Sequence, residues 1–169
     1  FQTSIDEGIK VIMPYYGIPK GQTDEDVAMA FNKYILTELL RKQMNFSGVI
    51  CTDWGVIEER HWGVDDLSIS QRYEKSINAG VDQYGGEDKP EYIIDLVQKQ
   101  RISEKRIDES VRRILTNKFE LGLFENPFVK ESLVSELVNK KSYIEEGLDA
   151  QRKSIVLLLS LIHISEPTR

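Results

Sequence analysis

The fold of this chain is decided by one stretch of sequence, Asn45-Phe46-Ser47-Gly48-Val49-Ile50-Cys51-Thr52-Asp53-Trp54-Gly55. Its apolar centre, residues 49–51, is typical of a strand that is covered on both faces, and Gly55 marks the turn that follows. The predicted strand ends on the carboxylate of Asp53. Parallel α/β sheets and barrels bind their ligands at the carboxyl ends of their strands, so Asp53 is the first candidate for chemistry.

Two further strand-like segments lie on either side of this stretch. Residues 10–17 are apolar between glycines and carry Tyr15 and Tyr16 at their carboxyl end, and residues 81–84 precede a pair of glycines. Apolar residues at helical spacing separate these strands and predict four helices. The first helix is expected to begin at a Thr23 cap and to run to about Met44, the second to begin at Asp66 or Ser68, and the third at Pro90. The fourth is expected to begin at a Ser103 cap, with its inward-facing residues being Ile107, Val111, Ile114, Leu115 and Phe119.

This alternation predicts an α/β fold with parallel strands and helical crossovers. The strand ends near Tyr16, Asp53 and Tyr84 are about 30 to 40 residues apart, the spacing of units in a (β/α)8 barrel. Three units cannot close such a barrel and would leave an unpaired sheet edge. The chain is therefore expected to be either a small open sheet or part of a barrel. Residues 126–153 are interpreted as a linker, with a new strand over residues 154–158.

Composition restricts the function further. The chain has 169 residues, 40% hydrophobic and 30% charged, as in ordinary globular domains. The net charge of -6 argues against a nucleic acid or an anionic membrane as partner, because both require clustered Lys and Arg. Cys51 is the single cysteine, and no apolar run approaches the roughly 20 residues of a membrane-spanning helix. Because the first residue is Phe1, we expect the true amino terminus to be missing.

The residue types around Asp53 leave several roles open. The carboxylate is compatible with a glycosidase nucleophile, a phosphoacceptor, a metal ligand or a cap for the following loop. Trp54 favours a sugar site, because its ring packs against the C–H faces of a sugar while the carboxylate stabilises an oxocarbenium-like transition state. Tyr16 is interpreted either as a group whose hydroxyl points into the same crevice or as a core tyrosine.

Other polar residues are weaker candidates. Glu58, Glu59 and Glu87 are possible acid/base partners of Asp53, although most loop glutamates are solvated surface charges. His61 is interpreted as a loop or subsite residue, since no second histidine stands at metal-ligand spacing. No metal site is predicted.

At this point the sequence resembles a known family. Residues 48–54 resemble the nucleophile signature of glycoside hydrolase family 3, in which a glycine, an apolar strand, a small residue, Asp and Trp follow one another. Residues 9–16, 79–82, 106–115 and 118–127 are similar, in the same order, to a preceding strand, a following strand, a barrel-closing helix and the exit from the barrel. The resemblance covers about residues 1–158.

The resemblance implies the last three βα units of a (β/α)8 catalytic domain over residues 1–125, a linker over 126–153 towards a second α/β domain, and the start of that domain at 154–159. It implies a retaining, exo-acting β-glycosidase, similar to a β-glucosidase, that acts on β-linked glucosides or oligosaccharides without a cofactor. Asp53 is then the nucleophile, Trp54 lines the sugar subsite, and Tyr16 lies near the nucleophile. A secreted or periplasmic location is implied by resemblance alone.

Some features depart from the family pattern. Thr52 stands where the family usually has Ser. The family's Lys-His pair and its acid/base, which the second domain supplies, lie outside this chain, so none of the three glutamates should inherit the acid role and the chain alone is expected to be inactive. Residues 160–169 resemble a translated sequencing adapter and are expected to pack poorly.

An alternative of another class remains open from the residues. The chain could be a flavodoxin-like binding or receiver module that uses Asp53 as a regulatory carboxylate. Such a module should form a self-contained sheet and unfold in a single cooperative transition, whereas part of a barrel should expose an apolar sheet edge.

Overall fold

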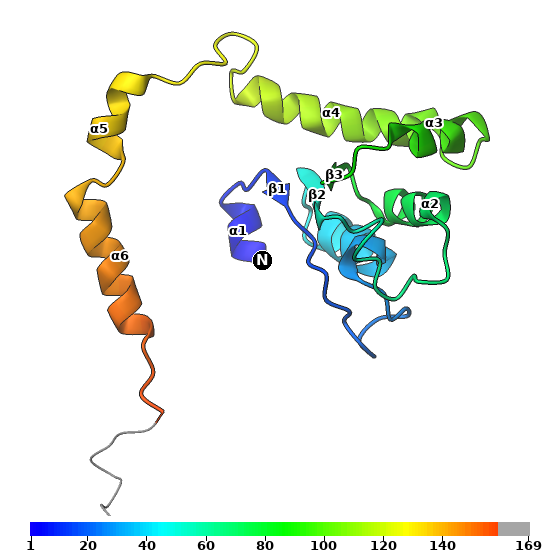
Figure 1. The fold of residues 1–169 in the computed structure, drawn as a ribbon, viewed down its shortest axis with the longest axis horizontal. Coiled ribbons are helices and arrows are strands. Elements are labelled where there is room, and N and C mark those ends of the chain that lie inside the picture. The colour runs from blue at the N-terminus through cyan, green and yellow to red at the C-terminus, as the bar shows by residue number, and fades with distance from the viewer. Residues whose placement is uncertain (159–169) are drawn as a thin grey trace, which may run out of the picture. The chain divides into compact units, whose positions relative to one another are not determined.

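A computed structural model describes residues 1–158, which fall into two compact units, Phe1–Asn126 and the part of the chain that begins at Pro127 (Figure 1). The elements of the first unit are α1 (Gln2–Asp6), β1 (Val11–Ile12), η1 (Met29–Phe31), η2 (Tyr34–Gln43), β2 (Val49–Trp54), α2 (Ile69–Ala79), β3 (Gln83–Gly85), α3 (Pro90–Gln98) and α4 (Glu104–Glu120). Those of the second are η3 (Glu131–Leu133), α5 (Val134–Leu137) and α6 (Lys141–Ser154).

The three strands form a small parallel sheet in the order β1-β2-β3, with the Asp53 strand in the centre. The register pairs Val11 with Val49 and Cys51 with Gln83, and it shifts before Trp54. At this irregularity the amide of Gly85 donates a hydrogen bond to Thr52 Oγ1 at 3.0 Å. The predicted mixed α/β fold with parallel strands and helical crossovers is confirmed.

The two faces of the sheet differ in how far they are covered, because successive side chains of a strand point to opposite sides. On one face Ile50 and Thr52 are 0% and 3% exposed, and Ile50 belongs to the hydrophobic core that the helices complete. On the other face Val11 is 47% exposed and Cys51 is half-buried. The prediction that the central strand is covered on both faces is correct for Val49 but wrong for Cys51.

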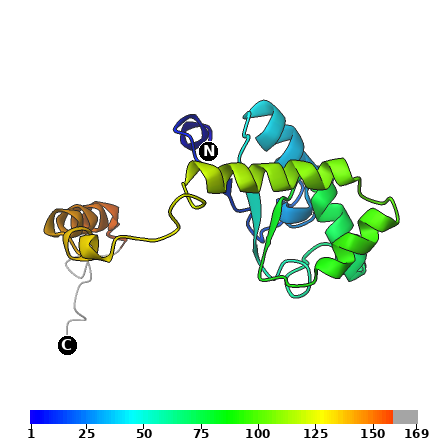
Figure 2. The same cartoon turned by 90° about the horizontal axis from the view of Figure 1, so that it is seen from above.

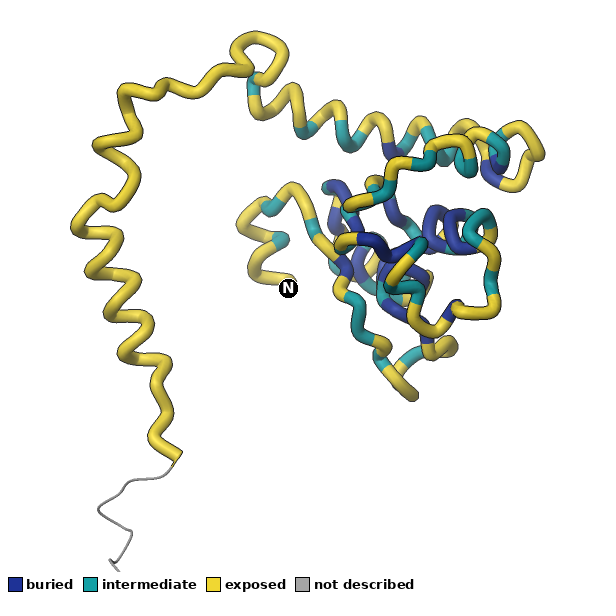
Figure 3. Tube along the Cα trace, viewed as in Figure 1, coloured by how far each residue is buried: buried dark blue, intermediate teal, exposed yellow. Residues whose placement is uncertain are grey.

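Capping residues define the helices that follow the sheet. Ser68 and Gln71 form a reciprocal capping box at the start of α2, and Ser103 Oγ accepts a hydrogen bond from the Arg106 amide at the start of α4. Pro90 occupies the first turn of α3. These helix starts were predicted from the sequence and are confirmed. Figure 3 shows that the buried residues gather on β2, α2 and η2.

The segment before β2 differs from the prediction. Thr23 does not cap a helix: its hydroxyl donates to the Glu25 carbonyl and accepts from Asn32 Nδ2, each at 2.8 Å. The helical backbone begins only with η1 and continues as the π-helix η2, whose start is bound by Asn32 Oδ1 accepting from the Ile35 amide. Short polar side chains bind the nearby backbone and so compete with helix formation.

Two predicted strands are shorter than expected. β1 ends at Ile12, because Pro14 has no N–H to donate to a ladder, so Tyr15 and Tyr16 lie in the segment after the strand. The third strand begins at Gln83 rather than Val81, although the Asp82 amide still donates to the Ile50 carbonyl at 2.9 Å.

A buried carboxylate that sequence reasoning did not identify ties the helices to the sheet. Asp82 Oδ2 accepts hydrogen bonds from Arg41 at 2.5 Å and from the Ile50 amide at 3.0 Å, and Oδ1 accepts from Ser110 and Arg113 at 2.7 Å each. The Asp82 side chain has no exposed surface. Through Arg113 it joins the residue before β3 to α4, the long helix that runs beside the strands (Figure 2).

The outer part of α4 also differs from the prediction. Ile107 packs against the core, but Val111, Leu115 and Phe119 are 46%, 40% and 58% exposed rather than directed inward. Phe119 contacts Phe124, whose ring centre lies 4.4 Å from its own.

The second unit is described as far as residue 158. Helix α6 lies at the end of the predicted linker and includes Ser154, and residues 155–158 are exposed and form no strand, so the strand predicted over residues 154–158 is wrong. Residue 159, assigned to the start of a second domain, and the adapter-like residues 160–169 lie outside the described part of the chain. Within residues 1–158, no helix combines the length and the apolar character needed to cross a membrane.

Candidate active site

Asp53 lies at the carboxyl end of the central strand, as expected, and its side chain is half-buried. Its Oδ1 atom accepts a hydrogen bond of 2.7 Å from the amide of Trp54. This bond orients the carboxylate against its own backbone. β3 pairs with β2 as far as Trp54, so the end of β3 lies beside this group, whereas β1 has ended opposite Ile50.

Trp54 presents its ring to solvent and packs on the segment after β3. Its side chain is 67% exposed, and a Cβ atom added to Gly86 would come within 2.5 Å of the indole. Gly86 also has a φ of +72°, a conformation that favours glycine. The indole therefore lies directly on the Gly86 backbone, while most of the residue stays exposed.

Tyr16 reaches the same strand end from the other side. Its hydroxyl donates a hydrogen bond of 2.9 Å to the Trp54 carbonyl and lies beside the Asp53 carboxylate. Partial burial and the Asp53 carboxylate raise the pKa of the Tyr16 hydroxyl, while Arg60 and the Trp54 carbonyl oppose the shift. The structure thus brings Tyr16, Asp53 and Trp54 together, although Tyr16 belongs to a loop and not to a strand end.

Arg60 is a part of this cluster that sequence reasoning missed. Its Nη1 donates to the Trp54 carbonyl at 3.3 Å and to Glu59 at 2.8 Å. Its guanidinium carbon lies 5.4 Å from the centre of the Tyr16 ring, within the range of a cation–π contact. The ring of Trp62 lies 5.5 Å from that of Tyr16. Only the closeness of Arg60 to Asp53 in the sequence could have indicated that Arg60 belongs to this cluster.

The glutamates near Asp53 have structural partners. Glu87 Oε1 accepts from the Ile57 amide at 2.8 Å and so holds the loop after β2, whose Val56 and Ile57 are buried. Glu58 pairs with Lys89 at 2.6 Å, and this hydrogen bond raises the pKa of Lys89. His61 Nε2 lies 3.7 Å from Asp65 Oδ1, in the same loop.

A polar depression lies next to the Trp54 ring and holds a volume of about 280 Å³. Its lining comes from the end of β2 and the loops after β2 and β3, and it is rich in carboxylates. The lining residues are Trp54, Gly55, Glu58, Glu59, Gly86, Glu87, Asp88 and Lys89. A tryptophan face beside charged groups suits a ligand that has both apolar C–H faces and hydroxyl groups.

Comparisons with known proteins agree on one family. Residues 1–117 match the model of the glycosyl hydrolase family 3 N terminal domain. The chain is 46% identical over 168 residues to the probable beta-glucosidase C of Aspergillus oryzae, covering 94% of this chain and 26% of that protein. It is 36% identical to the periplasmic beta-glucosidase/beta-xylosidase of Dickeya chrysanthemi, covering 87% of this chain and 26% of that one.

Solved structures give the same result. The beta-glucosidase from Listeria innocua superposes with a TM-score of 0.72 at 29% identity, over 93% of this chain and 21% of that chain. A beta-glucosidase involved in saponin metabolism from intestinal bacteria gives 0.73 at 28% identity, over 95% and 21%. The chain spans about a quarter of the length of the curated relatives it matches. Nothing in these matches supports a flavodoxin-like binding or receiver module.

Proposed function

The chain belongs to glycosyl hydrolase family 3, and we propose that the full-length protein is a retaining, exo-acting β-glucosidase with Asp53 as its nucleophile. One observation carries this proposal. Asp53 stands at the carboxyl end of the central parallel strand, where such folds bind ligands, with the exposed ring of Trp54 beside it. A carboxylate next to an aromatic face is the arrangement that glycoside hydrolysis requires.

In the proposed reaction Asp53 attacks the anomeric carbon of the terminal glucose and displaces the aglycone oxygen. A covalent glycosyl-enzyme forms with inverted configuration, and water then attacks the same carbon, releases the Asp53 carboxylate and restores the β configuration. An acid must protonate the leaving oxygen in the first step and accept a proton from water in the second.

We assign this acid/base role to residues outside the chain. Glu87 is occupied by the amide of Ile57, and Glu58 and Glu59 form ion pairs with Lys89 and Arg60. This engagement is the reason that none of the three is proposed as the acid. The family resemblance suggests the second domain as its source.

Trp54 and Tyr16 have separate proposed roles in substrate binding. The exposed Trp54 ring offers a flat apolar surface to the sugar, and the Gly86 backbone beneath fixes its orientation. Tyr16 holds the Trp54 carbonyl and lies beside the carboxylate, so it keeps the nucleophile in place.

The proposed architecture is the last three βα units of a (β/α)8 barrel over residues 1–125, followed by a linker over 126–153 and a second α/β domain that begins at 154. The sheet supports this proposal, because helices cover the Ile50 face while Val11 and Cys51 on the opposite face are partly exposed. In a closed barrel that second face would line the interior.

The proposed substrates are β-linked glucosides or short oligosaccharides. The relatives are named beta-glucosidases, one also a beta-xylosidase, and a mutant of the Listeria innocua enzyme was solved in complex with laminaribiose.

The stereochemistry of the first-formed sugar tests the proposal. We expect proton NMR of the full-length enzyme acting on an aryl β-glucoside to show β-glucose before mutarotation, and the Asp53→Asn variant to lose almost all turnover. First appearance of α-glucose would contradict a covalent intermediate.

A further inference from the structure

We propose that Arg60 is a positioning residue that fixes the Trp54–Gly55 peptide, directly after the nucleophile, and so holds Asp53 in the geometry for nucleophilic attack. This inference rests on the proposed function, in which Asp53 is the nucleophile. It concerns the carbonyl group of Trp54, which accepts hydrogen bonds from both the Tyr16 hydroxyl at 2.9 Å and Arg60 Nη1 at 3.3 Å.

These two side chains hold a peptide that the sheet binds on one side only: its Gly55 amide donates to the Gly85 carbonyl at 3.0 Å, but β1 does not reach it. The pairing of β2 with β3 shifts register between Cys51 and Trp54, and β1 has already ended at Ile12. The backbone next to the nucleophile therefore lies at an irregular end of the ladder. A carbonyl oxygen has two lone pairs, so two donors saturate it and restrict the tilt of the peptide plane.

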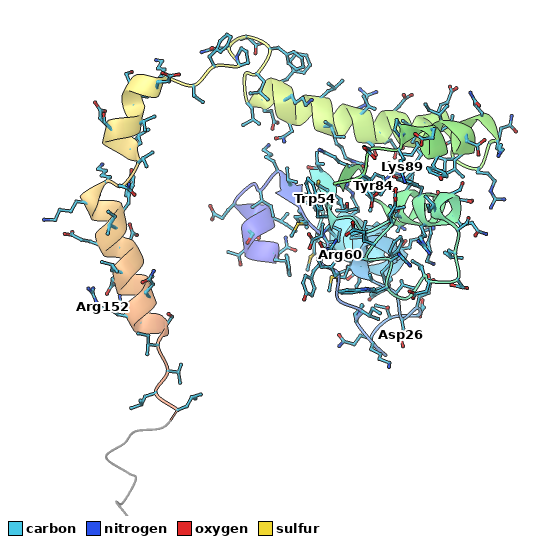
Figure 4. All side chains as sticks on the ribbon, in the orientation of Figure 1. Asp26, Trp54, Arg60, Tyr84, Lys89 and Arg152 are labelled. Carbon is cyan, nitrogen blue, oxygen red and sulfur yellow. The ribbon has the colours of Figure 1, made fainter. Side chains whose placement is uncertain are left out.

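The loop after β2 holds Arg60 in place. The amide of Arg60 donates to the Gly55 carbonyl at 2.9 Å, which turns the chain back towards the strand end. Val56 and Ile57 anchor this turn in the core, and Glu59 binds the guanidinium at 2.8 Å. Figure 4 shows Trp54 and Arg60, which come from β2 and from this loop.

Arg60 also holds the second donor. Its guanidinium lies over the Tyr16 ring at 5.4 Å, and the Trp62 ring contacts the same tyrosine at 5.5 Å. The ring is therefore fixed by a cation and by a second aromatic group, and its hydroxyl is aimed at the Trp54 carbonyl. Removing Arg60 takes away one donor and loosens the other, so the Asp53 carboxylate loses its fixed approach to the anomeric carbon.

A rival role for Arg60 is direct contact with the aglycone. The two roles separate with a substrate that has almost no aglycone, such as a 2-deoxy-2-fluoro-β-glucosyl fluoride. This reagent glycosylates the nucleophile, releases fluoride and then stalls. Its inactivation rate constant reports attack by the carboxylate, and its inhibition constant reports binding of the sugar.

The test measures both constants for the full-length enzyme and its Arg60→Met, Arg60→Lys and Arg101→Met variants. Arg101 is the matched control, because it forms an ion pair of 2.9 Å with Glu74 and none with the Asp53 cluster. We expect Arg60→Met to lower the inactivation rate constant about 10- to 100-fold with the inhibition constant unchanged, the cost of misplacing a reacting group. Arg60→Lys keeps the cation but not the planar guanidinium donors, so its inactivation rate constant should lie between those of the wild type and Arg60→Met. Arg101→Met should have the same inactivation rate constant and inhibition constant as the wild type.

Two results would overturn the inference. An unchanged inactivation rate in Arg60→Met, with a raised KM only for aryl glucosides, would make Arg60 an aglycone contact. If Arg60→Met does not fold, a wild-type inactivation rate constant in Arg60→Lys would likewise contradict the positioning role of Arg60. The labelled residue separates this failure from that of the proposed function: a wild-type enzyme that is labelled elsewhere than at Asp53 refutes the function itself.

Discussion

The hydroxyl of Tyr16 donates a hydrogen bond of 2.9 Å to the backbone carbonyl of Trp54. This bond connects the loop after β1 to the end of β2, although the two strands pair only through Val11–Val49 and Ile12–Ile50. It therefore continues the link between the strand ends beyond the point where the ladder stops. The proposed nucleophile, Asp53, lies immediately before the bonded peptide.

Removal of this bond should weaken catalysis moderately. For Tyr16→Phe in the full-length enzyme we expect kcat/KM for an aryl β-glucoside to fall about 3- to 10-fold, the size of one hydrogen bond. Tyr15→Phe is the matched control, because that ring is 61% exposed and its neighbour is Tyr16 itself. Equal losses in both variants would show that the hydroxyl of Tyr16 has no special role.

The same pair predicts a pH dependence. The pKa of Tyr16 is raised above its ordinary value of about 10 by partial burial and by Asp53, so the hydroxyl remains a donor below about pH 10. Its contribution is present at lower pH and is lost as the pH rises through the folded-state pKa. The activity ratio of wild type to Tyr16→Phe should be constant from pH 5 to 9, and a ratio that falls within this range would contradict the assignment.

Sequence patterns predicted the parts of this fold that depend on neighbours in sequence. The Ser68 and Ser103 caps, the Pro90 helix start and the parallel direction of the strands follow from local chemistry and from strand spacing. The predicted Thr23 cap is wrong, because the Thr23 hydroxyl accepts a hydrogen bond from Asn32 across the loop. Helical periodicity in the sequence does not reveal this competing contact.

Contacts between distant segments were not predictable in this way. Asp82 is buried by side chains from η2 and α4, Arg41 and Arg113, that lie 41 and 31 positions away in the sequence. The Asp53 strand end was identified, but Arg60 was not, because its contact with Tyr16 depends on how the loop folds back. The roles assigned to Asp53, Trp54 and Tyr16 remain predictions.

The Trp54 ring should depend on the absence of a side chain at Gly86. An alanine Cβ there would meet the indole at 2.5 Å, so Gly86→Ala should displace the ring and lower kcat/KM about 10- to 100-fold. Gly21→Ala is a close control, because Gly21 has a φ of +67° with no atom within 4 Å, against +72° at Gly86. Similar activities of the two variants would show that the ring position does not matter.

Asp82 should be important for stability. Asp82→Asn leaves Arg41, Arg106 and Arg113 without their buried counter-charge, and we expect a loss of about 3 to 5 kcal/mol in the free energy of unfolding. Asp95→Asn removes a solvent-exposed pair with Lys99 and should cost under about 1 kcal/mol. Denaturant unfolding of the full-length enzyme measures both, and equal midpoints would contradict the structural role of Asp82.

The partly exposed sheet face and α4 predict the behaviour of the 169-residue chain by itself. Val11, Val111, Leu115 and Phe119 are each at least 40% exposed, so the isolated chain should bind an apolar dye such as anilinonaphthalene sulfonate. Its fluorescence should exceed that of the full-length enzyme at equal concentration. Weak dye binding with a single cooperative unfolding transition would instead indicate a self-contained module.

The position of the trapped sugar tests the central claim most directly. After the full-length enzyme is inactivated with a 2-deoxy-2-fluoro-β-glucosyl fluoride, peptide mass spectrometry should find the fluoroglucosyl group on the peptide that contains Asp53 and on its carboxylate. The Asp53→Asn variant should take up no label. Labelling of another carboxylate in the wild-type enzyme, or an Asp53→Asn variant that is labelled at the wild-type rate, would contradict the assignment of Asp53 as the nucleophile.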